Sequence, residues 1–320
     1  MGDTPRILLV VTGDLELAAF AAALGRVFPM AYFEARMSVG LTGPEGRRLR
    51  APNPGLGEAK GVEIVEDLLG AAIPTTPGGD GFDFAVALDD VELVNEPGDE
   101  HADAGVATIL EHVALSVDLV LARARANETV EKIPKGHARR DFRFHGDADR
   151  RKFLRECCSF HLLRPMVEAL FFGDLEVIRA ELGKTKPRIY FDPMAQDIEA
   201  FAVDDDAYLT SPNGWIPSGA RGAASWATEN RRRHPKHYLQ YLLDPTGTVR
   251  RPFREKEHGK RMLEALHWER VVGPDVHARM VRSFLRDVAE MVGVAPRWLE
   301  SGASHPTVSR KPSGRLRNVL

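Results

Sequence analysis

The chain has 320 residues with a formal net charge of -3, and 43% of its residues are hydrophobic and 28% charged. This composition is typical of a folded globular protein of one or two domains, and it excludes wholesale disorder and a small disulfide-stapled scaffold. The apolar run over residues 7–11 is too short for a signal segment, and no run reaches the length of about 18 residues that a spanning helix needs. We therefore expect a cytoplasmic protein without a membrane partner.

Several chemistries are disfavoured because their motifs are missing. The sequence contains no P-loop, no dinucleotide-binding glycine motif, no Gly-x-Ser-x-Gly turn and no His-Glu-x-x-His zinc motif. The two cysteines, Cys157 and Cys158, are neighbours, so they lack zinc-ligand spacing and are poorly placed to bond to each other. We expect both to be reduced core residues.

The amino-terminal part alternates strand and helix patterns. The apolar run 7–11 predicts a central strand, and the Ala- and Leu-rich run 15–24 predicts a helix with Asp14 at its cap. Residues 30–37 favour a second extended segment. The glycines, prolines and arginines of residues 40–60 indicate a long loop.

A second set of elements follows this loop. Residues 62–69 suit a helix, residues 84–88 predict a buried strand, and residues 100–127 predict a long helix because their apolar positions recur three and four residues apart. Strands that alternate with helices imply a parallel or mostly parallel sheet. We therefore expect an α/β domain over residues 1–128.

Acidic residues gather where the second buried strand ends. Asp89, Asp90 and Glu92 follow the apolar run, and Asp14 and Glu16 follow the first strand. If the two strands are parallel neighbours, all these carboxylates meet at one edge of the sheet, where open α/β sheets bind ligands. Carboxylate oxygens suit Mg²⁺ or Mn²⁺, so each of these acids is a candidate metal ligand. Solvated turn residues or helix caps are the alternative.

Two basic stretches are candidate nucleic-acid contacts. The first, residues 132–155, is either a solvated linker or a phosphate-binding surface. The second, residues 231–236, either binds phosphates or is the solvated start of a helix with Pro235 in its first turn. Lys236 would then lie near the scissile group. The candidate contacts are Arg139, Arg140, Arg150, Arg151, Arg231, Arg232, Arg233 and Lys236.

Residues 129–308 are expected to form a mixed, mainly helical region, followed by a flexible basic tail over residues 309–320. Glu168 and Asp174 lie in very apolar sequence, so each either pairs with an arginine such as Arg164 or binds a metal. The expected elements are helices over 175–182, 229–243, 257–268 and 274–292, a short strand over 188–191 and loops over 192–228.

A short apolar strand, a turn with glycine and acids, a helix and a later strand that ends in Asp90-Val-Glu92 resemble a TOPRIM domain. The carboxyl-terminal half resembles a small class of TOPRIM-like proteins of bacterial phage defence, related to overcoming-lysogenisation-defect nucleases. That second resemblance rests on residues 164–174, 234–239 and 257–263. Together they imply a metal-dependent nuclease whose catalytic residues are Glu16, Asp89 and Asp90, with Lys236 added from its basic stretch.

One position departs from the TOPRIM pattern. Such domains carry glutamate just before the first glycine, where this chain has Thr12. The alternative to a nuclease is therefore a degenerate domain that binds nucleic acid, or a structural subunit of a defence complex. Nucleic acid is the expected partner, and a partner ATPase or other defence subunit and a homo-oligomer are left open.

Overall fold

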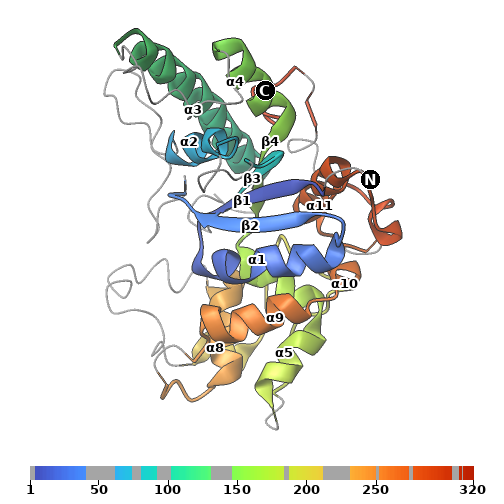
Figure 1. Cartoon of the computed structure of the whole chain (residues 1–320). Coiled ribbons are helices and arrows are strands. Elements are labelled where there is room, and N and C mark those ends of the chain that lie inside the picture. The colour runs from blue at the N-terminus through green and yellow to red at the C-terminus, as the bar shows by residue number, and fades with distance from the viewer. Residues whose placement is uncertain are drawn as a thin grey trace.

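A computed structural model describes most of the chain (Figure 1). Its described residues are 4–40, 62–73, 81–91, 102–130, 146–183, 187–211, 231–249, 252–273, 277–304, 310–311 and 313–320. The predicted loop over residues 40–60 therefore lies almost wholly outside them.

The centre of the molecule is a four-stranded sheet in the order β2-β1-β3-β4. Its strands are β1 (Arg6–Val11), β2 (Tyr32–Met37), β3 (Phe84–Asp90) and β4 (Cys158–Leu163). Every neighbouring pair is parallel. The predicted α/β class with a parallel sheet is confirmed.

Helices cover both faces of this sheet because β1 and β3 are apolar on both sides. Leu9 and Val11 belong to a core shared with α1 (Asp14–Val27), whereas Leu8 and Val10 belong to a second core on the opposite face. The helices of the second core are α2 (Val62–Gly70), α3 (Ala102–Val130) and α4 (Asp147–Cys157). Figure 1 shows α2, α3 and α4 on one side of the strands and α1 on the other.

The carboxyl-terminal half is mainly helical, as predicted, and much of it packs on the face that α1 covers (Figure 1). It begins with the 3-10 helix η3 (Val167–Gly173). The α-helices are α5 (Leu175–Leu182), α6 (Asp206–Thr210), α8 (Pro235–Leu243), α9 (Lys260–Ala265), α10 (Trp268–Val272) and α11 (Arg279–Val292). The longest described helix of this half, α11, is preceded by shorter helices and followed by the 3-10 turn η7 (Arg297–Leu299).

Several local predictions differ from the structure. The predicted loop over residues 192–228 contains α6, and the helix predicted over residues 257–268 is broken at residues 266–267, between α9 and α10. Residues 188–191 contain no strand, and β4 was not predicted, although it pairs with β3 and so extends the sheet beyond the boundary that we expected at residue 128. The cap of α1 is Gly13, and Asp14 is its first helical residue. The two strand differences share a cause, since strand pairing depends on distant segments that a local pattern does not contain.

The end of the chain closes the free edge of β4. The side chain of Asn318 accepts a hydrogen bond from the Phe160 backbone N–H (3.0 Å) and donates one to its carbonyl oxygen (2.6 Å). The backbone N–H of Arg317 donates to the carbonyl of Cys158 at 2.8 Å, and Leu316 and Val319 are buried. The prediction of a flexible tail is therefore wrong for residues 313–320. Backbone groups at a strand edge need partners, and the tail supplies them.

We predict that Asn318→Asp lowers the free energy of unfolding by about 2 kcal/mol, because a carboxylate cannot donate to the buried Phe160 carbonyl. Urea unfolding of the purified protein measures the change. Leu320→Ala is the control, since that side chain is 61% exposed and its loss should change little. Equal midpoints for Asn318→Asp and the wild type would contradict the role given to the tail.

Candidate functional site

The sheet has one topological switch point, between β1 and β3. The chain moves from β1 outward to β2 and then returns to place β3 on the other side of β1. Crevices outside the carboxyl ends of such strands are the usual ligand sites of open α/β sheets. Val11 is in register with Leu88, so the next residues, Thr12 and Asp89, lie side by side. The Thr12 hydroxyl donates to Asp89 Oδ1 at 2.8 Å.

The first turn of α1 brings Glu16 into the same crevice. Glu16 is only 2% exposed, and its carboxylate folds back over Gly13. A Cβ atom at position 13 would collide with that carboxylate, so any larger residue there would displace the Glu16 carboxylate from its present position. The sequence prediction that Glu16 and the end of β3 converge is borne out by this geometry.

Three further segments complete a cavity of about 440 Å³. Glu168 enters from η3, Lys236 from the first turn of α8, and Glu255 from a π-helical turn, η6 (Glu255–Gly259). Pro235 is the first residue of α8, in its first turn as predicted, and its fixed φ favours a helix start directly before Lys236. The described residues that line the cavity are Thr12, Gly13, Leu15, Glu16, Ser38, Val39, Gly40, Asp89, Asp90, Met166, Glu168, His234, Lys236 and Glu255.

Five carboxylates surround one lysine among these lining residues. Lys236 Nζ lies 3.6 Å from Glu168 Oε1 and forms an ion pair with Glu255. Burial alone would lower the pKa of Lys236, but the negative charges of Glu168 and Glu255 have the larger effect and raise this pKa. Burial also raises the pKa of Glu168, although Lys236 opposes the shift. Burial, reinforced by Glu168 and Glu255, raises the pKa of Glu16 to about 8.

Two oxygen atoms that line the cavity lack a hydrogen-bond partner within the part of the chain that the structure describes. They are Glu16 Oε1 and Ser38 Oγ, and both are buried. Asp90 Oδ1, by contrast, accepts from the backbone N–H of Val167 at 3.0 Å. An unsatisfied buried oxygen costs free energy, so the cavity is suited to a ligand that would engage it.

The remaining candidate metal ligands fall elsewhere. Asp14 does not line the cavity: its side chain is half exposed and pairs with Lys256 at 3.1 Å. Each step along a helix turns the side chain by about 100°, so Asp14 and Glu16, two positions apart, point about 200° apart although both lie in the first turn. Glu92 lies outside the described residues.

Two of the six described basic residues that were predicted as nucleic-acid contacts, Arg150 and Arg231, are buried. Arg231 is 6% exposed, lies over the Tyr208 ring at 4.8 Å and donates to the carbonyls of Leu209 and Ser211. Arg232 remains exposed and pairs with Asp204. The sequence shows the charge of residues 231–233, but it does not show the aromatic ring that receives Arg231.

The first basic stretch is a helix where it is described, namely α4 from residue 147 onward. Arg150 is buried there, whereas Arg151 is exposed and pairs with Asp147 at 3.0 Å. Arg139 and Arg140 lie outside the described residues. A solvated linker is therefore the wrong description of residues 147–155.

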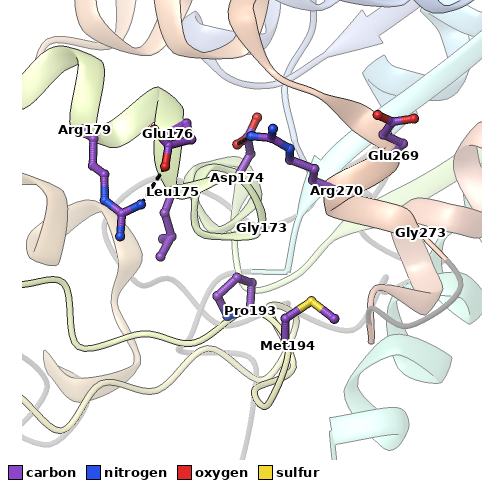
Figure 2. Close-up of a pocket in the computed structure, with 10 residues that line it drawn as sticks. All are labelled: Gly173, Asp174, Leu175, Glu176, Arg179, Pro193, Met194, Glu269, Arg270 and Gly273. Atoms are coloured by element: carbon purple, nitrogen blue, oxygen red, sulfur yellow. Dashed lines mark hydrogen bonds and ion pairs between the residues drawn. The ribbon is translucent and has the colours of Figure 1, made fainter.

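Asp174 belongs to a second pocket, of about 350 Å³, and its charge is already paired. Figure 2 shows Asp174 beside Arg270 at the wall of this pocket. Arg270 donates to one carboxylate oxygen and the backbone N–H of His267 to the other, at 2.8 Å and 3.1 Å. Burial alone would raise the pKa of Asp174, but these hydrogen bonds outweigh it and lower that pKa. Structural pairing is the better of the two predicted roles, with Arg270 rather than Arg164 as the partner.

Glu255 and His234 line the main cavity, and neither was predicted from the sequence. His234 caps α8 and stacks on His237 with ring centroids 3.6 Å apart. Burial holds the pKa of His234 well below its usual value and lowers that of His237 to about 3, so both rings are neutral at ordinary pH. The one sequence signal near Glu255 is the stretch 257–263, which carries part of the family resemblance.

Comparisons with protein-family models, with curated proteins and with solved structures find no match to this chain. Among the described helices, none has the length and apolar character that crossing a bilayer requires. The TOPRIM resemblance accordingly remains a prediction from the sequence.

The cavity suits a hard divalent cation in its donor chemistry. Carboxylate oxygens predominate, and the unpartnered Glu16 Oε1 is a buried acceptor of the kind that Mg²⁺ or Mn²⁺ engages. Within the described ranges, however, no group of at least three Asp, Glu, His or Cys side chains is arranged to hold a metal ion. The donor types therefore fit a cation, without forming a complete protein-only ligand set among those residues.

We predict that Glu16→Gln removes the part of the pH dependence of stability that comes from the Glu16 carboxyl group. In the folded state the Glu16 pKa is about 8 rather than 4.5, so the native chain binds more protons than the unfolded chain between these values. Wild-type stability should therefore fall as pH rises from 5 to 9, by several kcal/mol at about 1.4 kcal/mol for each pKa unit.

Urea unfolding at pH 5 and pH 9, with a chelator present, measures this difference for the wild type and for Glu16→Gln. Asp14→Asn is the matched control because it changes an acid in the same helical turn whose side chain is half exposed. Parallel pH profiles of Glu16→Gln and the wild type would exclude a raised pKa at Glu16.

Proposed function

We propose that the cavity at the switch point binds Mg²⁺ or Mn²⁺ and that the protein is a phosphodiesterase acting on nucleic acid. The observation that carries this proposal is the meeting of Glu16, Asp89, Asp90 and Glu168 with Lys236 in one cavity. Carboxylates alone would repel a phosphate, so a polyanionic substrate requires a cation among them. The predicted role in bacterial phage defence belongs to the same proposal and rests on the sequence resemblance alone.

One or two carboxylates among Glu16, Asp89 and Asp90 would hold the cation at a time, with water completing its ligands, because no three of these side chains are arranged around one ion. When bound, the cation would polarise a phosphoryl oxygen or activate a water molecule. Thr12 orients Asp89 through its hydrogen bond, and the Val167 N–H holds Asp90. Lys236 supplies the positive charge of the protein itself, with which it can bind a phosphate oxygen. Burial of Glu16 and Asp89 excludes bulk water and strengthens these interactions.

A second candidate is a module that binds nucleic acid, or a subunit of a defence complex, without cleaving a bond. Thr12 favours it, since the carboxylate usual in TOPRIM domains at this position is replaced by a hydroxyl that bonds to Asp89. Metal binding and cleavage therefore have to be measured separately.

We predict that the wild type cleaves DNA or RNA only with Mg²⁺ or Mn²⁺, and that Glu16→Gln, Asp89→Asn or Asp90→Asn lowers the rate by about 100-fold or more, the usual effect of removing one group that stabilises a transition state. Single- and double-stranded DNA and RNA serve as substrates. Mn²⁺ affinity, measured by electron paramagnetic resonance, should fall in the same variants.

Asp14→Asn is the control for this assay, because Asp14 is an acid of the first turn that does not line the cavity. It should keep both Mn²⁺ binding and cleavage. Nucleic-acid binding without cleavage under either metal would favour the second candidate. A wild type that binds neither Mn²⁺ nor nucleic acid would rule out both candidates that depend on this cavity.

A further inference from the structure

The π-helical turn η6 (Glu255–Gly259) lies against the segments that carry the other cavity acids. The Gly259 N–H reaches back to the Arg254 carbonyl at 3.2 Å, the long hydrogen bond of a π-helix, and the Arg254 N–H donates to His258 Nδ1 at 3.0 Å. π-helical turns are rare and occur frequently at functional sites. Here the turn places Glu255 at the cavity wall.

Close packing ties this turn to both neighbours of the cavity. A Cβ atom on Gly259 would lie 3.0 Å from Leu15 Cδ1 and 3.2 Å from Phe253 Cζ, so the glycine backbone contacts both side chains closely. Leu15 immediately precedes Glu16. Phe253 packs edge-on against Phe171 of η3, the element that carries Glu168. The carriers of Glu16, Glu168 and Glu255 therefore form one packed unit.

Lys236 is fixed at the centre of this unit. Its ammonium lies between Glu255, with which it forms an ion pair, and Glu168 Oε1 at 3.6 Å. The Glu168 side chain is 3% exposed, whereas that of Glu255 is 27% exposed. Glu168 is thus held by burial, and Glu255 contacts Lys236 from the solvent side. We call this arrangement of Lys236 between Glu168 and Glu255 the lysine clamp.

We infer that Glu255 is a positioning residue, which the π-helical turn holds in place so that the Lys236 ammonium stays directed into the acidic cavity. A lysine has a flexible four-carbon stem with many rotamers, so two carboxylates on different elements restrict its ammonium more than one carboxylate does. The importance of this position for catalysis rests on the proposed function. The position itself does not.

The test measures the reactivity of Lys236 without nucleic acid or metal. Wild type and Glu255→Gln are treated briefly with acetic anhydride, and mass spectrometry gives the acetylation rate of each lysine. We expect Lys236 to react about tenfold faster in Glu255→Gln, the effect of losing one charge-assisted hydrogen bond. Lys260, which pairs with Glu264 at 3.7 Å on the adjoining helix, should be unchanged.

Glu264→Gln is the matched control, because it breaks the same kind of pair and should leave the Lys236 rate unaltered. Gly259→Ala keeps both charges but places a Cβ atom 3.0 Å from Leu15 Cδ1 and 3.2 Å from Phe253 Cζ. Because both of those side chains are buried, we expect the turn to shift in response and Lys236 acetylation to become faster. An unchanged Lys236 rate in Glu255→Gln overturns the inference. A rise at both lysines overturns it too, because Glu255 would then support the local fold rather than Lys236. An unchanged rate in Gly259→Ala removes the role of the turn.

The two proposals fail separately in this design. If Lys236 is acetylated faster in Glu255→Gln and the wild type cleaves nothing, the positioning role of Glu255 is supported and the nuclease function is excluded. If the wild type cleaves, Glu255→Gln should lower the cleavage rate while Mn²⁺ affinity changes little. Normal cleavage by Glu255→Gln would show that the lysine clamp does not serve the reaction.

Discussion

The parallel pairing of β1 with β3 is the contact on which the cavity depends. It sets Thr12 beside Asp89 and points the first turn of α1 toward the end of β3. Both strands are buried on both faces, and their side chains alternate between two separate cores. A slip of one residue would exchange every side chain between these cores and carry Asp89 to the opposite face. The two cores thereby determine the strand register, and the register determines where the Asp89 carboxylate lies relative to Thr12 and Glu16.

The same arrangement concentrates negative charge where water is scarce. Glu16 and Glu168 are almost fully buried, and Lys236 is the one lysine or arginine among the described residues around them. Burying a charge costs free energy unless it is paired, and the raised pKa of both glutamates reflects that cost. Acids that serve only stability are normally paired in full, as Asp174 is with Arg270 and His267. The contrast between Asp174 and Glu16 therefore separates a structural acid from a candidate functional one.

The sequence predicts the parts of this site that depend on local patterns. Apolar runs that end in acids identify β1 and β3, and the geometry of parallel sheets then brings Glu16 and Asp89 together. It does not predict Glu255, because that residue reaches Lys236 through a π-helical turn whose position depends on packing against Leu15. The prediction that Arg231 contacts phosphate is not supported for a related reason. A run of arginines reports charge, whereas the burial of Arg231 depends on Tyr208, which is distant in the sequence.

Thr12 has a different meaning once its neighbours are known. A glutamate at this position would add a carboxylate directly beside Asp89, where the threonine hydroxyl instead donates a hydrogen bond. Glu16 occupies the same cavity from one turn further along the chain, near the helix amino terminus, where backbone N–H groups favour a carboxylate. Glu16 thus supplies to the cavity a carboxylate that Thr12 does not. Because a cation responds to the position of oxygen atoms and not to their order along the chain, Thr12 alone is weak evidence against a metal-dependent site.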